Sequence, residues 1–360
     1  MVSKAKVVLP LPDKPVKTIK EFFGNSKSIF FKLFSLAPLI TIFVSISEDI
    51  IDNNKEIIYQ KTISSARNMF CDTKTKMSIN KYLSTIESFK GKKIIVTGAT
   101  SGIGFELVKK LALKDASIIL LARNLDKANK VRETLLSINS SISIDIIQYD
   151  QSDYDLIDSA VKEIMEKHSD FYALVANAAI MCPPKKEKSK QGLPLTIDTN
   201  FLGLKRFLDQ LIPVYKGKRY IIQGSLIAGF NIKKDVDIYN NDYPLFKQYN
   251  ISKMCVESLF YYYLVNNKDN EFILTEPGVT GSDIIRYFKE PIKTIGKLFL
   301  KVTAHSPSKA SLTLLKGLTS DSQNGDFIIP RDLFSMRGYP RYKKFPNKRR
   351  REFLINKINN

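Results

Sequence analysis

The sequence predicts an α/β fold built on one doubly wound parallel sheet with helices on both faces. From Lys90 onward, short apolar runs alternate with segments whose apolar residues recur at helical spacing. The apolar runs lack a polar alternation, which is typical of strands buried on both faces of a parallel sheet. The composition, 44% hydrophobic and 26% charged, is that of a globular protein and excludes a disordered, collagenous or multispanning chain.

The expected elements follow one another as strand, helix, strand. The first strand, residues 92–97, ends in a glycine-rich turn, and the helix over 103–113 carries Leu107, Val108 and Leu111 on one face. This order requires right-handed crossovers, which cover both faces of the sheet. The other expected strands are 117–121, 143–148, 171–176, 219–223 and 272–275, and the other expected helices are 125–137, 154–167, 199–214 and 246–266.

Residues 1–88 are expected to form an extension, poorly structured or helical, ahead of the domain at 89–340. Its apolar segment, 29–47, includes fifteen uncharged residues at 33–47. A spanning helix needs roughly 20 apolar residues, so the segment favours an interfacial or packing helix over a membrane anchor. Residues 48–88 resemble a linker. Because Met77 would be a natural start for the domain, one hypothesis is that residues 1–76 are dispensable or absent from the mature protein.

The net charge of +20 lies largely at the ends of the chain, with ten basic and two acidic residues in 331–360. The tail at 341–360 could contact phosphates or an anionic membrane surface peripherally. Solubilisation is the commoner role of such a run, so nucleic-acid binding is not the favoured function.

The cysteine and histidine counts restrict the chemistry. Three cysteines without CxxC spacing fit a reducing compartment, so we expect a cytoplasmic protein, with 29–47 as the segment for any membrane association. Two histidines far apart leave little for a His-based zinc site or a Ser-His-Asp triad. We therefore expect no metal.

The turn after the first strand reads TGATSGIG. Gly98 allows a tight turn, Gly102 lets the backbone approach a pyrophosphate, and Gly104 lets the helix pack close to the strand. The amide groups at the helix start then face the anion. The expected dinucleotide contacts of this turn are Gly98, Thr100, Ser101, Gly102, Ile103 and Gly104.

The second strand ends without the acidic residue that typically binds the ribose hydroxyls of NAD. Arg123 stands there instead. A guanidinium suits a 2′-phosphate, so the sequence predicts a preference for NADP(H), with NAD(H) as the alternative. Asp150, after the third strand, is placed to reach the adenine amino group.

Tyr249 and Lys253 form YNISK near the start of an expected helix, four residues apart and so on one face. A tyrosine, with a pKa of about 10, needs a nearby ammonium group to act in acid–base catalysis at neutral pH. Ser225, at the end of another strand, could donate a hydrogen bond to a carbonyl oxygen as charge develops on it.

From Lys90 to Tyr339 the sequence resembles the short-chain dehydrogenase/reductase family. TGATSGIG, VANAA, TNFLG, QGSLIAG, YNISK and EPGVTGSDI are similar to its motifs, in the family's order. Together with the NADP(H) preference predicted from Arg123, the resemblance implies a Rossmann-type oxidoreductase with Asn200, Ser225, Tyr249 and Lys253 as the catalytic tetrad. Asn200 would hold a water in a proton relay, and Lys253 would also bind the nicotinamide ribose. It further implies cofactor contacts from Asn177, Pro277, Gly278, Thr280 and Ser282.

The chain departs from the family in three places. Ala179 replaces a glycine near the cofactor, Gln151 replaces an apolar residue, and an insertion over 232–243 is expected to loop out near the site. The long Ser225–Tyr249 spacing resembles the retinol-dehydrogenase-like branch, which implies a small hydrophobic carbonyl or alcohol as substrate, and the family implies a homodimer or tetramer. The alternative function is a catalytically silent dinucleotide sensor or scaffold.

Overall fold

The computed structural model describes residues 77–345, except for residues 182, 184, 230, 231, 233–235, 281–303, 333 and 334. The expected apolar segment at 29–47, the basic tail beyond residue 345 and Ser282 lie outside the described residues. Within the described part, no helix is both long enough and apolar enough to cross a bilayer.

The described residues form one sheet of eight strands with the order β3-β2-β1-β4-β5-β6-β7-β8. Neighbouring strands are parallel from β3 to β7, and β8 pairs antiparallel with β7. The doubly wound sheet predicted from the sequence is therefore confirmed. The strands are β1 (Lys93–Thr97), β2 (Ser117–Ala122), β3 (Ile144–Gln148), β4 (Ala173–Ala176), β5 (Arg219–Gln223), β6 (Glu271–Thr275), β7 (Phe327–Asp332) and β8 (Arg337–Lys343).

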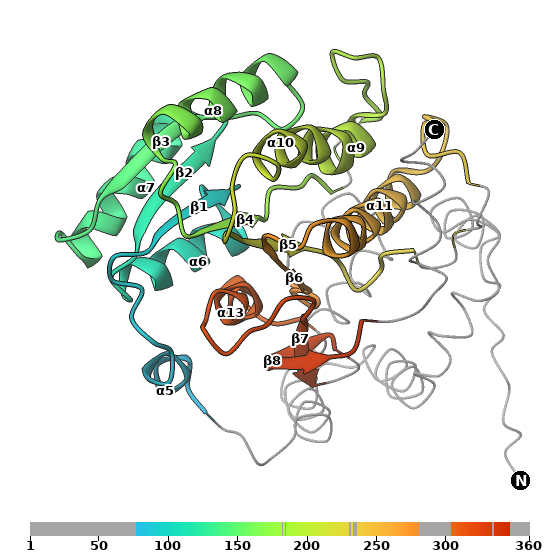
Figure 1. Cartoon of the computed structure of the whole chain (residues 1–360). Coiled ribbons are helices and arrows are strands. Elements are labelled where there is room, and N and C mark those ends of the chain that lie inside the picture. The colour runs from blue at the N-terminus through green and yellow to red at the C-terminus, as the bar shows by residue number, and fades with distance from the viewer. Residues whose placement is uncertain are drawn as a thin grey trace, which may run out of the picture.

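Helices cover both faces of the sheet (Figure 1). In β1, Ile94 and Val96 face one buried cluster and Ile95 faces the other, as the two-residue period of a strand requires. The helices are α5 (Ile79–Ser84), α6 (Gly102–Ala112), α7 (Leu125–Ile138), α8 (Tyr154–Lys167), α9 (Leu195–Ile197), the π-helix η1 (Asp198–Gly203), α10 (Leu204–Leu211), α11 (Leu245–Asn266) and α13 (Pro307–Gly317). Figure 1 shows α8, α10 and α11 on one face and α6 and α13 on the other.

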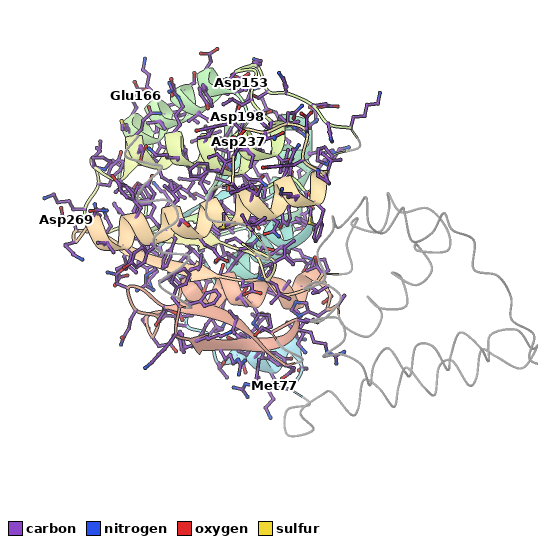
Figure 2. All side chains as sticks on the ribbon, turned by 90° about the vertical axis from the view of Figure 1, so that its right-hand side faces the viewer. Met77, Asp153, Glu166, Asp198, Asp237 and Asp269 are labelled. Carbon is purple, nitrogen blue, oxygen red and sulfur yellow. The ribbon has the colours of Figure 1, made fainter. Side chains whose placement is uncertain are left out.

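The packed region includes residues that the sequence assigned to the linker at 48–88. Helix α5 begins after its N-cap Ser78, and Leu83 is buried in the cluster beneath α6. The Tyr339 hydroxyl, on β8, donates to the backbone carbonyl of Met77. In Figure 2, Met77 lies at the bottom of the described part and Asp198 lies in its upper half.

The insertion expected near the site contributes to the core. Val236 and Ile238 are buried in the cluster formed by α8, α10 and α11. The backbone carbonyls of Asn241 and Tyr243 accept from the side-chain amide of Gln248, on α11. The described part of the insertion therefore packs against the helix that carries Tyr249 and Lys253.

Candidate active site

The predicted site residues gather at the carboxyl ends of the parallel strands. The glycine turn follows β1, Arg123 follows β2, Asp150 follows β3, Asn177 follows β4, Ser225 follows β5, and Pro277 to Thr280 follow β6. The strand order reverses between β1 and β4, which pair directly. Ligands of doubly wound sheets bind outside the strand ends at such a point.

The glycine turn is locked to the end of β4 through Asn177. The side-chain amide of Asn177 donates to the carbonyls of Thr97, at 2.9 Å, and Gly98, at 3.2 Å. Gly98 adopts a left-handed φ of +67°. A Cβ atom at Gly104 would overlap the carbonyl oxygen of Gly98 and lie 2.6 Å from Nδ2 of Asn177. The third glycine is thus required by close packing.

Replacing Gly104 by Ala is expected to destabilise the fold by about 3 kcal/mol, because the added methyl group must displace backbone. The matched control is Gly91→Ala, where φ is +78° but no atom lies within 4 Å of the added Cβ. Left-handed strain alone should cost that control about 1 kcal/mol. Urea unfolding of both variants measures the difference, and equal losses would contradict the packing role of Gly104.

The start of α6 can receive an anion. Its N-cap, Ser101, makes no side-chain capping bond, so its hydroxyl does not occupy the first amide groups. Gly102 is exposed, has a φ of +57°, and has open space where a Cβ would stand. Thr100, two residues before it, and Ile103, directly after it, are half-buried. These residues fit a pyrophosphate at the helix N-terminus.

The departure at Ala179 is compatible with this site. Ala179 is exposed, so its methyl group is not packed into the turn. Two of the hydrogen bonds that hold the loop come from backbone amides on its amino-terminal side: Asn177 and Ala178 both donate to the hydroxyl of Thr97, at 3.0 and 2.9 Å.

Arg123 and Asp150 lie together beyond the ends of β2 and β3. The Arg123 side chain is 76% exposed, and its Nε lies 3.9 Å from Oδ2 of Asp150. Oδ1 of Asp150 accepts from the amide and the hydroxyl of Ser152, at 2.9 and 2.7 Å. The carboxylate is therefore fixed, whereas most of the guanidinium side chain is exposed to solvent.

Lys253 is 4% exposed and its Nζ donates to the backbone carbonyl of Gln223, at 2.9 Å. Burial lowers the pKa of Lys253 to about 8, and the carboxylate of Glu257, one turn along the helix, opposes this by raising it. Glu257 is itself buried against Gly224, whose added Cβ would lie 3.1 Å from Oε1 of Glu257. The ammonium group is thus held at the end of β5, two residues before Ser225.

Tyr249 and Ser225 are both half-buried. Tyr249 lies one turn before Lys253 on α11, so both side chains leave the same face of the helix. The Ser225 carbonyl accepts a hydrogen bond from the amide of Ala228, at 3.0 Å. This bond closes a turn directly after β5.

Asn200 lies in the π-helix η1, within the segment 199–214 that the sequence predicts to be a helix. Its amide nitrogen donates to the carbonyl of Ile180 and to the hydroxyl of Ser252, both at 2.9 Å. Its Oδ1 accepts from the amide of Ile180, at 2.8 Å. Both N–H groups of the side chain are therefore used within the protein, and Oδ1 keeps one further lone pair. π-Helical turns are frequent at functional sites.

The segment after β6 is held by contacts from the carboxyl-terminal part of the domain. Gly278 has a φ of +74°, and the Val279 amide donates to the carbonyl of Met336, at 2.6 Å. Nε2 of His305 lies 2.6 Å from the carbonyl oxygen of Pro277, and Thr280 forms a parallel bridge with His305. Burial lowers the pKa of His305 to about 4, so its imidazole stays neutral.

From the sequence, Gln151 is recognised only as a departure from the family pattern. The sequence assigns no role to Gln223, Ser252, Glu257 or His305. Gln223 donates from its side-chain amide to Oδ1 of Asn177, at 3.2 Å, and links β5 to β4. A polar residue at the end of an otherwise apolar strand was the available signal for Gln223. His305 gave none, because it lies far along the chain from Pro277.

Comparison with known proteins agrees with this geometry. The short chain dehydrogenase family model matches residues 92–263. An uncharacterised oxidoreductase of Schizosaccharomyces pombe is 33% identical over 131 residues, 36% of this chain and 38% of that protein. A short-chain dehydrogenase/reductase of Armillaria gallica is 27% identical over 274 residues, 71% of this chain and 85% of that protein.

Among solved structures, an alcohol dehydrogenase from the archaeon Thermococcus sibiricus, complexed with 5-hydroxy-NADP, has the same fold. Its TM-score is 0.53 at 20% identity, over 69% of this chain and 99% of that one. This chain spans well under half the length of the Schizosaccharomyces relative, at 38%. Its sheet order, its glycine turn and these matches together establish that residues 92–263 belong to the short-chain dehydrogenase/reductase family, whose members are NAD(P)-dependent oxidoreductases.

Proposed function

We propose that this protein is an NADP(H)-dependent oxidoreductase that moves a hydride between nicotinamide and a carbonyl or alcohol group of a small hydrophobic molecule. The observation that carries the proposal is the buried Lys253 on the face of α11 that also holds Tyr249, at the end of β5 that leads to Ser225. A buried ammonium group beside a tyrosine is the arrangement that proton transfer at neutral pH needs.

Each member of the tetrad has a separate task in this proposal. Tyr249 donates a proton to the substrate oxygen in reduction and accepts one in oxidation. Lys253 lowers the pKa of Tyr249 through its positive charge, and Ser225 donates a hydrogen bond to the substrate oxygen. Asn200 fixes the π-turn, and the remaining lone pair of its Oδ1 accepts a hydrogen bond from a water of the proton relay. The dinucleotide, when bound, supplies the hydride.

The glycine turn, Asn177 and the segment from Pro277 to Thr280 would hold the dinucleotide. The start of α6 suits the pyrophosphate, and Asp150 suits the adenine. The preference for NADP(H) over NAD(H) rests on Arg123. Its side chain is exposed, and among the described residues its ion-pair partner is the carboxylate of Asp150, 3.9 Å from Nε.

Arg123→Ala is expected to weaken NADPH binding by about tenfold to a hundredfold, because a charge-assisted hydrogen bond contributes about 1.5–3 kcal/mol. NADH binding should change by less than about twofold, since its ribose has no phosphate for the guanidinium. The matched control is Arg132→Ala, an exposed arginine on α7. Calorimetric titration measures both dinucleotides, and equal losses for both would refute the phosphate-binding role.

The substrate class follows from the resemblance to retinol-dehydrogenase-like members. The test is NADPH oxidation with a panel of hydrophobic ketones and aldehydes, and NADP⁺ reduction with the corresponding alcohols. Saturable turnover with any of them supports the enzyme. Tight NADPH binding without turnover across the panel would instead support a catalytically silent sensor or scaffold. We also propose a cytoplasmic location. We further propose a homodimer or tetramer, and sedimentation of the purified protein would test this oligomeric state.

A further inference from the structure

We propose that Gln151 is a positioning residue that holds the π-turn of Asn200 in its working geometry. The inference rests on the proposed function, because it concerns the residue assigned to the proton relay. Gln151 directly follows Asp150 at the carboxyl end of β3 and is 4% exposed. A buried glutamine side chain is costly unless its amide is hydrogen-bonded, so its partners indicate what it does.

The side-chain amide of Gln151 bridges two segments that meet at the site. Its Nε2 donates to the carbonyl of Thr199, at 2.6 Å, and lies 3.4 Å from the carbonyl of Ala178. Its Oε1 accepts from the hydroxyl of Tyr149, at 3.1 Å, which fixes the orientation of the amide. One side chain thus joins η1 to the loop that follows β4.

The contact to Thr199 acts on Asn200 directly. The carbonyl of Thr199 and the amide nitrogen of Asn200 belong to the same rigid peptide plane. Fixing the carbonyl therefore fixes the direction in which the chain enters Asn200. The backbone of Gln151 adds a second restraint, because a Cβ atom at Gly203 would overlap its carbonyl oxygen, so η1 passes in close contact with residue 151.

Asn200 passes this restraint on to the part of α11 that carries Tyr249. Its amide donates to the Ser252 hydroxyl at 2.9 Å, and that hydroxyl donates to the carbonyl of Tyr249 at 2.8 Å. Asn200 and Gln151 also bind the same loop, through Ile180 and Ala178. The two amides form parallel links between η1 and the loop after β4. Losing one of them should loosen the other.

The experiment compares wild type, Gln151→Met, Asn200→Ala and the double variant. Methionine keeps the length and burial of the side chain but cannot donate to Thr199. We expect Gln151→Met to lower kcat about tenfold or more, with the Kd for NADPH within about twofold of wild type. In the Asn200→Ala background the same change should lower kcat by less than about twofold, because the two residues act as one unit.

The matched control is Asn270→Leu. Asn270 is also a buried amide that holds backbone carbonyls: its Nδ2 donates to Tyr215 at 2.8 Å and lies 3.4 Å from the carbonyl of Ile212. It directly precedes β6, so it lies at the amino-terminal ends of the parallel strands, whereas the site lies at their carboxyl-terminal ends. Its replacement should lower the melting temperature while kcat stays within about twofold of wild type. Additive losses for Gln151→Met and Asn200→Ala, or an unchanged kcat for Gln151→Met, would overturn the proposal.

A second readout requires no turnover. Hydrogen exchange of residues 198–203 in the cofactor-free protein should accelerate about tenfold or more in Gln151→Met, but not in Asn270→Leu. Unchanged exchange in Gln151→Met would overturn the positioning role. If wild type binds NADPH but turns over no substrate, the proposed function fails, while this measurement still decides whether Gln151 holds the turn. Gln151→Asn, whose amide is too short to reach Thr199, replaces Gln151→Met in every arm if the methionine variant does not fold.

Discussion

Tyr249→Phe is expected to lower kcat about a thousandfold, because it removes the hydroxyl that transfers the proton to or from the substrate oxygen. The phenylalanine ring occupies the same half-buried position on α11, so the fold and the dinucleotide contacts remain. The Kd for NADPH should therefore change by less than about twofold.

The control for this variant is Tyr262→Phe. Tyr262 is a half-buried tyrosine on the same helix, packed edge-on against the ring of Tyr263 at 5.5 Å, three turns beyond the site. Its loss of a hydroxyl should leave kcat within about twofold of wild type. Turnover that survives in Tyr249→Phe would exclude Tyr249 as the proton donor.

Lys253→Met is expected to abolish turnover and also to stabilise the cofactor-free protein. Burial lowers the pKa of Lys253 from 10.5 to about 8, so the protonated side chain costs folding free energy at neutral pH. That cost is about 3 kcal/mol. The carbonyl of Gln223 loses its donor in the variant, which offsets about 1 kcal/mol, for a net gain of about 2 kcal/mol.

The stability gained in Lys253→Met decreases as pH rises. Because the folded pKa lies below the unfolded one, the penalty on the lysine is fully present below about pH 8 and disappears as pH rises toward 10.5. The stabilisation by methionine should therefore shrink between these values. For the wild type, kcat/KM should fall as pH rises above about 8, when Lys253 loses the charge that activates Tyr249.

Lys110 supplies the control for this prediction. It is 3% exposed on α6, and burial likewise lowers its pKa to about 8, but its Nζ donates to the Ser308 hydroxyl, away from the strand ends. Lys110→Met should leave kcat within about twofold of wild type. Urea unfolding between pH 7 and pH 10 measures the stability change. A Lys253→Met protein that is less stable than wild type at pH 7 would contradict the account of the buried charge.

The parallel core of the fold was predictable because its strands are short and apolar, and because the segments between them have apolar residues at helical spacing. The strands β1 to β6 and the helices α6, α7, α8 and α11 agree with the predicted elements within a few residues. Strands β7 and β8 were not predicted. They carry Pro330 and Pro340, which face each other in the register of the pair, and proline normally argues against a paired strand. The antiparallel edge of the sheet tolerates them.

The sequence predicts one helix over 199–214, and the structure differs from this prediction in the type of helix. The structure has α9, η1 and α10 in succession, with a π-turn at Asn200. Helical periodicity cannot show this, because the turn depends on contacts from Gln151 and Ile180, which lie elsewhere in the chain. The glycine turn could be predicted since all of its residues are adjacent. The partner of Lys253 could not, because it is a backbone carbonyl thirty residues away.

The central claim is that the carboxyl ends of β1 to β6 form an NADP(H) site. Calorimetric titration of the full chain with NADPH and with NADH tests it most directly. The account predicts saturable binding of both at one site per chain, with NADPH bound at least about tenfold more tightly because of Arg123. Absence of binding by both dinucleotides would contradict the site, and equal affinities would contradict the assignment of Arg123 to the 2′-phosphate.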